Sequence, residues 1–155
     1  MDSDTLQIVR AAPEHLDILT EFFARVAADE ASRHFHPHPF DAAGAATIAS
    51  FQGRDLYYLA IANGVIGYGM LRGWDEGYEV PSLGIVVDPA WRGRGIARLL
   101  MQFLHGAARI RGCERIRLKV YPENVRAKAL YESLGYRFGE VTDGQLIGSL
   151  SPIRG

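Results

Sequence analysis

The 155-residue sequence contains a single cysteine, Cys113, and its formal net charge is only −1. One cysteine excludes an intrachain disulfide and is typical of proteins of the reducing cytoplasm. No apolar run approaches the roughly 18 residues that a membrane-spanning helix needs. The first ten residues are acidic and lack an apolar stretch, so they do not resemble a secretory signal. We therefore expect a cytoplasmic protein without a membrane partner.

The remaining composition is that of an ordinary globular domain. Apolar residues make up 48% of the chain and charged residues 23%, and this length favours one domain over residues 1–155. The charge is nevertheless divided. Residues 1–91 carry 5 Lys and Arg against 13 Asp and Glu, whereas residues 92–155 carry 12 against 5. This division is either chance scatter over solvated faces or the mark of two ligands, an anion at the C-terminal half and a cation at the N-terminal half.

The hydrophobic periodicity predicts the element order β-α-α-β-β-β-α-β-α-β-β. The Asn63-Gly64 pair predicts a hairpin between two strands, and a strand–helix–strand unit follows it. The sheet must therefore be mixed, with one parallel pair around residues 83–88 and 115–121. The last strand, 145–150, is expected at a sheet edge, where it would be available for pairing in a homodimer. Strands are expected at 6–12, 55–62, 65–74, 80–88, 115–121, 136–141 and 145–150, and helices from 13, 41, 95 and 124.

The stretch "WRGRGIARLL", residues 91–100, places arginines and glycines between a buried strand and an amphipathic helix. The first four N–H groups of a helix have no partner, and the helix dipole adds a partial positive charge there. Glycines let an anion approach these groups, and Arg92 and Arg94 supply charged donors. In isolation the stretch is also explained by a solvated basic turn. In this strand–loop–helix context it predicts a phosphate-binding loop.

Arg92-x-x-Gly95-x-Ala97 resembles the (Q/R)-x-x-G-x-(G/A) motif of the GNAT superfamily of N-acetyltransferases. "LGIVVDPAWRGRGIARLLM" is similar to the family's fourth strand, pyrophosphate loop and helix. "LKVYPENVRAKALYESLGYRF" is similar to its fifth strand and following helix, so the resemblance covers about residues 83–139. It implies an α/β fold with a mixed, mostly antiparallel sheet of about seven strands, about four helices and one splayed parallel pair. It also implies acetyl transfer from acetyl-CoA to a primary amine of a small molecule or peptide, by direct attack on the thioester.

The resemblance also implies the residues that bind the cofactor. Backbone groups of Ile85, Val86 and Val87 would pair with the pantetheine arm. Asn124 would reach the same arm, and Tyr131 would point at the thioester sulfur. The pyrophosphate would be held by the amides of the loop, namely Arg92, Gly93, Arg94, Gly95, Ile96 and Ala97.

Two residues are candidates for proton transfer. Tyr131 can donate to the departing sulfur, although its place on an apolar stripe also fits a purely core role. Glu79 is expected to begin the central strand, with the parity of Pro81 and Leu83, and is the candidate base. Family bases usually lie nearer the loop, where Pro81 and Leu83 can do no proton chemistry. Glu79 is therefore either a base acting through water or an exposed, solvated carboxylate.

The histidines of "SRHFHPHPF", residues 32–40, suggest a metal site, but neighbouring prolines and the absence of zinc-type spacing argue against it. We expect no metal. A loop between the first two helices would line the acceptor groove in this fold, or it is a plain packing loop. Asp75 and Glu76 nearby would suit a cationic acceptor, or they are simply solvated. The candidate acceptor pocket comprises Arg33, His34, His36, Phe40, Trp74 and Tyr78.

The sequence leaves two other classes of function to compare with acetyl transfer. A non-catalytic coenzyme A-binding sensor or interaction module would share the loop and lack turnover. Nucleic-acid binding is disfavoured, because the 8 Lys and Arg of residues 92–119 are spread over a loop, a helix and a strand without clustered aromatics.

Overall fold

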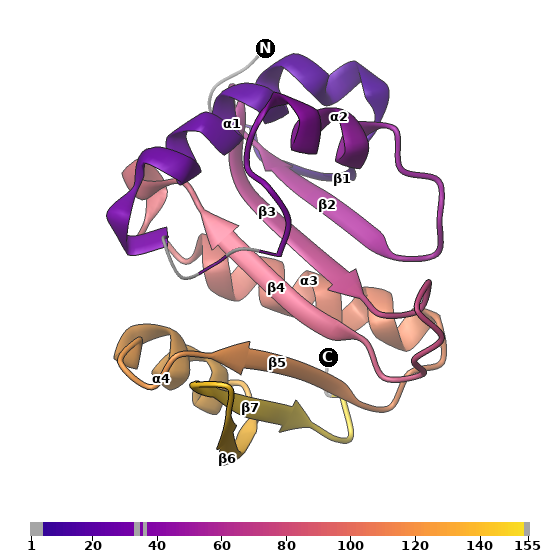
Figure 1. Ribbon diagram of the computed structural model, residues 1–155, viewed down its shortest axis with the longest axis vertical. Coiled ribbons are helices and arrows are strands. Elements are labelled where there is room, and N and C mark those ends of the chain that lie inside the picture. The colour runs from indigo at the N-terminus through magenta and orange to yellow at the C-terminus, as the bar shows by residue number, and fades with distance from the viewer. Residues whose placement is uncertain (1–4, 33–34, 36, 154–155) are drawn as a thin grey trace.

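The computed structural model describes residues 5–32, 35 and 37–153. Over these ranges the chain forms one seven-stranded sheet with α-helices on both faces (Figure 1). The strands are β1 (Gln7–Arg10), β2 (Leu56–Ile61), β3 (Val65–Arg72), β4 (Ser82–Val87), β5 (Ile116–Val120), β6 (Arg137–Thr142) and β7 (Gln145–Leu150). The helices are α1 (Leu16–Ala28), α2 (Ala42–Ala49), α3 (Ile96–Ile110) and α4 (Val125–Ser133), with 3-10 turns at Pro13–His15, Glu30–Ser32 and Pro89–Trp91. The predicted element order and the mixed α/β fold are confirmed.

The strand order is β1-β2-β3-β4-β5-β7-β6. Strands β1 to β4 form an antiparallel meander, β4 and β5 are the predicted parallel pair, and β7 lies between β5 and β6. The prediction of an edge strand at residues 145–150 is wrong. The final hairpin folds back so that its second strand pairs with β5, which leaves β6 at the edge.

Apolar side chains fill both faces of the sheet. On one face a buried cluster joins the two N-terminal helices to β3: it holds Leu19, Phe22 and Phe23 of α1, Ile48 of α2, and Tyr68 and Met70 of β3. On the opposite face, a second apolar cluster joins α3 and α4 to the sheet through Met101, Leu104, Ile116, Leu118 and Leu130. None of the helices in the described ranges combines the length and the apolarity that a bilayer crossing requires.

Local sequence signals determine where several elements begin and end. The Asp41 side chain accepts from the Gly44 amide at 2.7 Å and caps α2. Asn63 and Gly64 both have positive φ, 54° and 107°, which is the backbone that a tight hairpin between β2 and β3 needs. Asn124 caps α4 by accepting from the Ala127 amide at 3.3 Å. These three predictions are confirmed.

Candidate active site

The two parallel strands touch at one end and separate toward the other. Ser82 of β4 lies opposite Arg117 of β5, and the Arg117 amide donates to the Pro81 carbonyl at 3.0 Å. No further register pair joins β4 to β5 within the described residues. Figure 1 shows the resulting wedge, which widens toward the carboxyl ends of both strands. The predicted splayed pair is therefore present.

The ladder with β3 decides which β4 backbone groups face this wedge. The Asp88 amide donates to the Ile66 carbonyl, on the β3 side, at 2.8 Å. Because backbone groups alternate in direction along a strand, Val86 also directs its amide and carbonyl toward β3, where it lies opposite Tyr68. Ile85 and Val87 direct theirs into the wedge. Of the three strand residues expected to contact a cofactor, the structure leaves Ile85 and Val87 with open backbone groups on that side.

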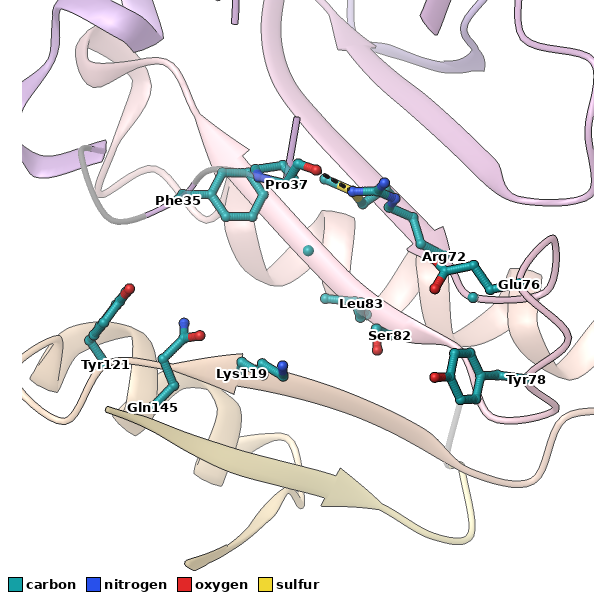
Figure 2. A pocket seen from close by; sticks show the side chains of 13 residues that line it. Phe35, Pro37, Arg72, Glu76, Tyr78, Ser82, Leu83, Lys119, Tyr121 and Gln145 are labelled. Atoms are coloured by element: carbon teal, nitrogen blue, oxygen red, sulfur yellow. Dashed lines mark hydrogen bonds between the residues drawn. The ribbon is translucent and has the colours of Figure 1, made fainter. Parts of the chain in front are cut away.

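A cavity of about 470 Å³ extends along the wedge from Ser82, at its closed end, to Tyr121, just past the carboxyl end of β5, on the sheet face covered by α1 and α2. Figure 2 shows its lining, which comes from segments far apart in the sequence. Phe35 and Pro37 of the loop before α2 form one wall, and Leu83 and Gly84 form part of the floor. The polar side chains of the lining are Arg72, Glu76, Tyr78, Ser82, Lys119, Tyr121 and Gln145.

Two hydrogen-bonded contacts dock the loop that forms this wall. Arg72 Nη1 donates to the Pro37 carbonyl at 2.5 Å. His38 Nδ1 lies 3.0 Å from the Pro39 carbonyl, and Nε2 lies 2.7 Å from the Tyr68 hydroxyl. Since a carbonyl only accepts, Nδ1 carries the proton and Nε2 accepts from Tyr68. Burial lowers the pKa of His38, which favours this neutral form.

Of the three histidines in the motif, the structure describes His38. His38 packs against the buried rings of Phe23 and Tyr68 and against the partly buried ring of Phe40. Phe40, expected in the acceptor pocket, is a partly buried member of this aromatic cluster and does not line the cavity. Arg33, His34 and His36 lie outside the described residues. Among the residues that are described, no three His, Cys, Asp or Glu side chains gather as a metal-binding set.

The acidic turn after β3 divides into structural and exposed carboxylates. The buried Asp55 accepts from the amides of Gly73, Trp74 and Asp75. Asp75 in turn accepts from the amides of Arg54 and Asp55 at 2.9 Å each, and these bonds hold the pKa of the Asp75 carboxyl below its usual value. Asp75 is thus engaged in fastening the turn, whereas Glu76 lines the cavity.

Glu79 and Trp74 lie away from the cavity. The expectation that Glu79 begins the central strand is wrong, because residues 79 and 80 form a bend and β4 begins at Ser82. Glu79 lines a separate cavity of about 610 Å³, and Tyr78 contacts both cavities. Trp74 is only 7% exposed and packs beneath the Arg111 guanidinium, 4.5 Å from its ring centroid. Of the predicted pocket residues that are described, Tyr78 is the one that lines the cavity in the wedge.

The arginine–glycine loop lies at the start of α3. Gly93 and Gly95 have φ values of 78° and 82°, and a Cβ added at either would meet no atom within 4 Å. The first α-helical hydrogen bond runs from the Leu99 amide to the Gly95 carbonyl at 3.1 Å, so the preceding amides have no helical acceptor. The open space beside the two glycines and the amides without a helical acceptor together fit an anionic ligand.

The two loop arginines are held differently. Arg92 Nη2 contacts the Asp29 carboxylate at 2.6 Å and the Ser32 hydroxyl at 3.0 Å, so this guanidinium ties the loop to the end of α1. Arg94 stacks over the Trp91 ring at 4.8 Å and makes no ion pair with the described residues. Arg94 is therefore better placed than Arg92 to meet a phosphate without breaking an existing contact.

Tyr131 packs against the core beneath α4, with its ring 6.0 Å from that of Tyr136. Burial raises the pKa of Tyr131 to about 12, which keeps the hydroxyl protonated and able to donate. That hydroxyl makes no hydrogen bond with the rest of the described chain, and Tyr131 does not line the cavity of Figure 2. Both the core role and the donor role therefore remain compatible with its position.

The sequence analysis did not identify five polar residues of the cavity lining: Arg72, Ser82, Lys119, Tyr121 and Gln145. The alternation of "RIRLKVY" contained a signal, because it places Arg117, Lys119 and Tyr121 on one face of β5. The wedge that exposes this face is a tertiary feature, and no local pattern indicated it.

The chain is similar in sequence to known proteins. A sequence model described as the acetyltransferase (GNAT) family matches residues 12–136. The chain belongs to the GNAT acetyltransferase family. Acetyltransferase ECA0875 of Pectobacterium atrosepticum is 37% identical over 82 residues, which are 53% of this chain and 57% of that protein. The match thus spans little more than half the length of that relative.

Solved structures of this family share the fold over nearly the whole chain. The GNAT domain of S. lividans PAT superposes with a TM-score of 0.80 at 21% identity, over 94% of this chain and 90% of that one. The structure of YncA from Salmonella typhimurium, described with its cofactor acetyl-CoA, has a TM-score of 0.73 at 21% identity over 96% and 94%. These likenesses confirm the GNAT fold.

Proposed function

We propose that this protein is an N-acetyltransferase that moves an acetyl group from acetyl-CoA to a primary amine. The observation that carries the proposal is the wedge between β4 and β5, which has open backbone groups, an arginine- and glycine-rich loop at the start of α3 and a cavity with polar side chains along it. The family match and the acetyl-CoA described for YncA support the choice of cosubstrate.

The cosubstrate would be held mainly by backbone. The amides from Arg92 to Ala97 would bind the pyrophosphate, with Arg94 adding a charged donor. The backbone groups of Ile85 and Val87 would pair with the pantetheine arm. The Asn124 side-chain NH2 would contact the same arm while Oδ1 continues to cap α4. A wedge-facing amide of β4 would also donate to the oxyanion, a contribution on the order of 3 kcal/mol to the transition state.

In the chemical step the amine nitrogen attacks the thioester carbonyl carbon, and the carbon–sulfur bond breaks as the tetrahedral intermediate collapses. An alkylammonium of pKa near 10.4 is only about 0.1% neutral near pH 7.4, which costs roughly 4 kcal/mol. Glu76, the carboxylate that lines the cavity, would accept the amine proton through water. Tyr131 would donate a hydrogen bond to the departing thiolate.

The decisive experiment measures thiol release from acetyl-CoA over a panel of amines, together with acetyl-CoA affinity by calorimetry. Binding with turnover supports the proposal. Binding without turnover on any amine would favour the non-catalytic coenzyme A-binding module. Absence of binding would overturn both.

A further inference from the structure

We infer that the acceptor is a small amine that also carries a carboxylate, held by the positive charges of the cavity in the wedge. This inference rests on the proposed function and concerns which amine the same cavity takes. It differs from the cationic acceptor that the acidic turn suggested, because Asp75 is engaged in backbone hydrogen bonds.

The charge of the cavity lining is the first observation. Arg72 comes from β3 and Lys119 from β5, on either side of β4, and among the described residues of the lining the one carboxylate is that of Glu76. None of these three side chains forms an ion pair with the described residues. Figure 2 shows Arg72 and Lys119 in the lining on opposite sides of Ser82. The described lining thus carries two cationic side chains against one carboxylate, and this net positive charge favours an anionic group on the ligand.

The second observation is that Arg72 is held in place. Its Nη1 donates to the Pro37 carbonyl, and its guanidinium lies beside the Tyr57 hydroxyl. Arg72 is half-buried, and a guanidinium has five N–H donors, so several are left to a ligand. A guanidinium fixed in this way binds a carboxylate in a charge-assisted pair without first losing side-chain freedom.

The third observation is a further positive charge on β5, the strand that borders the cavity. Arg117 and Lys119 lie on the same face of β5, and Arg117 Nε is buried without a hydrogen-bond partner. A diamine or a lysine side chain would bring a second positive charge into this field and be repelled. A carboxylated amine instead places its carboxylate between Arg72 and Lys119 and leaves its amine for Glu76 and the wedge. The cavity of about 470 Å³ suits a small molecule.

The test compares α-amino acids with their carboxamides, which keep the amine and the side chain but lose the negative charge. The carboxamide has the less basic amine and is more often neutral, so reactivity alone favours it. We expect a KM for the amino acid at least tenfold lower. Equal or better use of carboxamides or diamines would overturn the inference while leaving acetyl transfer intact. No turnover with any amine despite acetyl-CoA binding would instead be a failure of the proposed function.

Variants of Arg72 and Lys119 test whether these two charges cause the preference for the amino acid over its carboxamide. Lys119 is exposed, and its side chain makes no hydrogen bond or ion pair with the described residues. We therefore expect Lys119→Gln to fold normally and to reduce the KM preference for the amino acid over its carboxamide at least threefold. Arg72→Gln should abolish the KM preference for the amino acid over its carboxamide. Arg72→Lys keeps the positive charge and should retain part of that preference. Arg137→Gln, on the exposed edge of β6, is the matched control and should change nothing. An unaltered preference in Lys119→Gln and Arg72→Gln would overturn the inference. A weakened acetyl-CoA affinity in Lys119→Gln would also overturn the inference, because Lys119 would then bind the cosubstrate and not the acceptor.

Discussion

Ser82 and Arg117 face each other where the parallel strands β4 and β5 meet, and beyond this pair the strands diverge. The position of this pair decides which part of the sheet is sealed and which part is open. Arg72, opposite Ser82 in the neighbouring ladder, and Lys119, two residues beyond Arg117, thereby reach a common cavity.

Gly95→Val is expected to raise the acetyl-CoA dissociation constant at least tenfold, about 1.4 kcal/mol. Gly95 has a φ of 82°, which a β-branched residue disfavours, so the loop amides would shift. Calorimetry measures the effect. Gly112→Val carries the same strain at a φ of 84°, just beyond the far end of α3, and should leave the affinity unchanged. Equal affinities for wild type and Gly95→Val would show that this loop does not bind acetyl-CoA.

Acetyl-CoA binding is expected to weaken with salt, because its phosphates would meet arginine in a partly exposed loop. Affinities at about 50 and 500 mM salt measure the dependence. Arg94→Gln should flatten it more than Arg92→Gln, since Arg92 is already paired with Asp29. A flat response in the wild type would indicate that backbone amides alone hold the pyrophosphate.

Tyr131→Phe is expected to lower kcat by roughly 10²-fold or more, the scale of general acid catalysis. The ring stays packed, so the KM for acetyl-CoA and the melting temperature should change little. Steady-state kinetics and thermal unfolding measure both. Tyr136→Phe removes a neighbouring hydroxyl and is the comparison for purely structural effects. A kcat near that of the wild type in folded Tyr131→Phe would leave Tyr131 as a core residue.

Glu76→Gln is expected to lower kcat/KM most near neutral pH, because the amine would lose its water-mediated proton acceptor. Glu79→Gln is the matched control, since Glu79 lines the other cavity. The pH–rate profile distinguishes loss of a base from loss of binding. A larger defect in Glu79→Gln than in Glu76→Gln would return the base to the position expected from the sequence.

The buried His105 is expected to make stability depend on pH. Its Nε2 lies 2.7 Å from the Tyr136 hydroxyl, and burial lowers the pKa of His105 to about 4. Because the folded pKa lies below the unfolded value near 6.5, this stability is complete above about pH 6.5 and is lost as the pH falls toward 4. The loss between pH 7.5 and 5 should be about 2 kcal/mol. Denaturant unfolding of wild type and His105→Gln measures it, and the same pH dependence in both would contradict this role.

The sequence by itself determined the order of the elements, the capping of α2 and α4, the hairpin at Asn63-Gly64 and the loop before α3. These features depend on hydrophobic period, on side chains that bond a neighbouring amide and on glycines that allow positive φ, all of which are local. The strand order around β7, the bend at Glu79 and the burial of Trp74 depend on contacts between distant segments. The cavity is likewise decided only by tertiary structure, because Phe35, Arg72, Ser82, Lys119 and Gln145 come together only when β4 and β5 separate and the loop before α2 docks on Arg72.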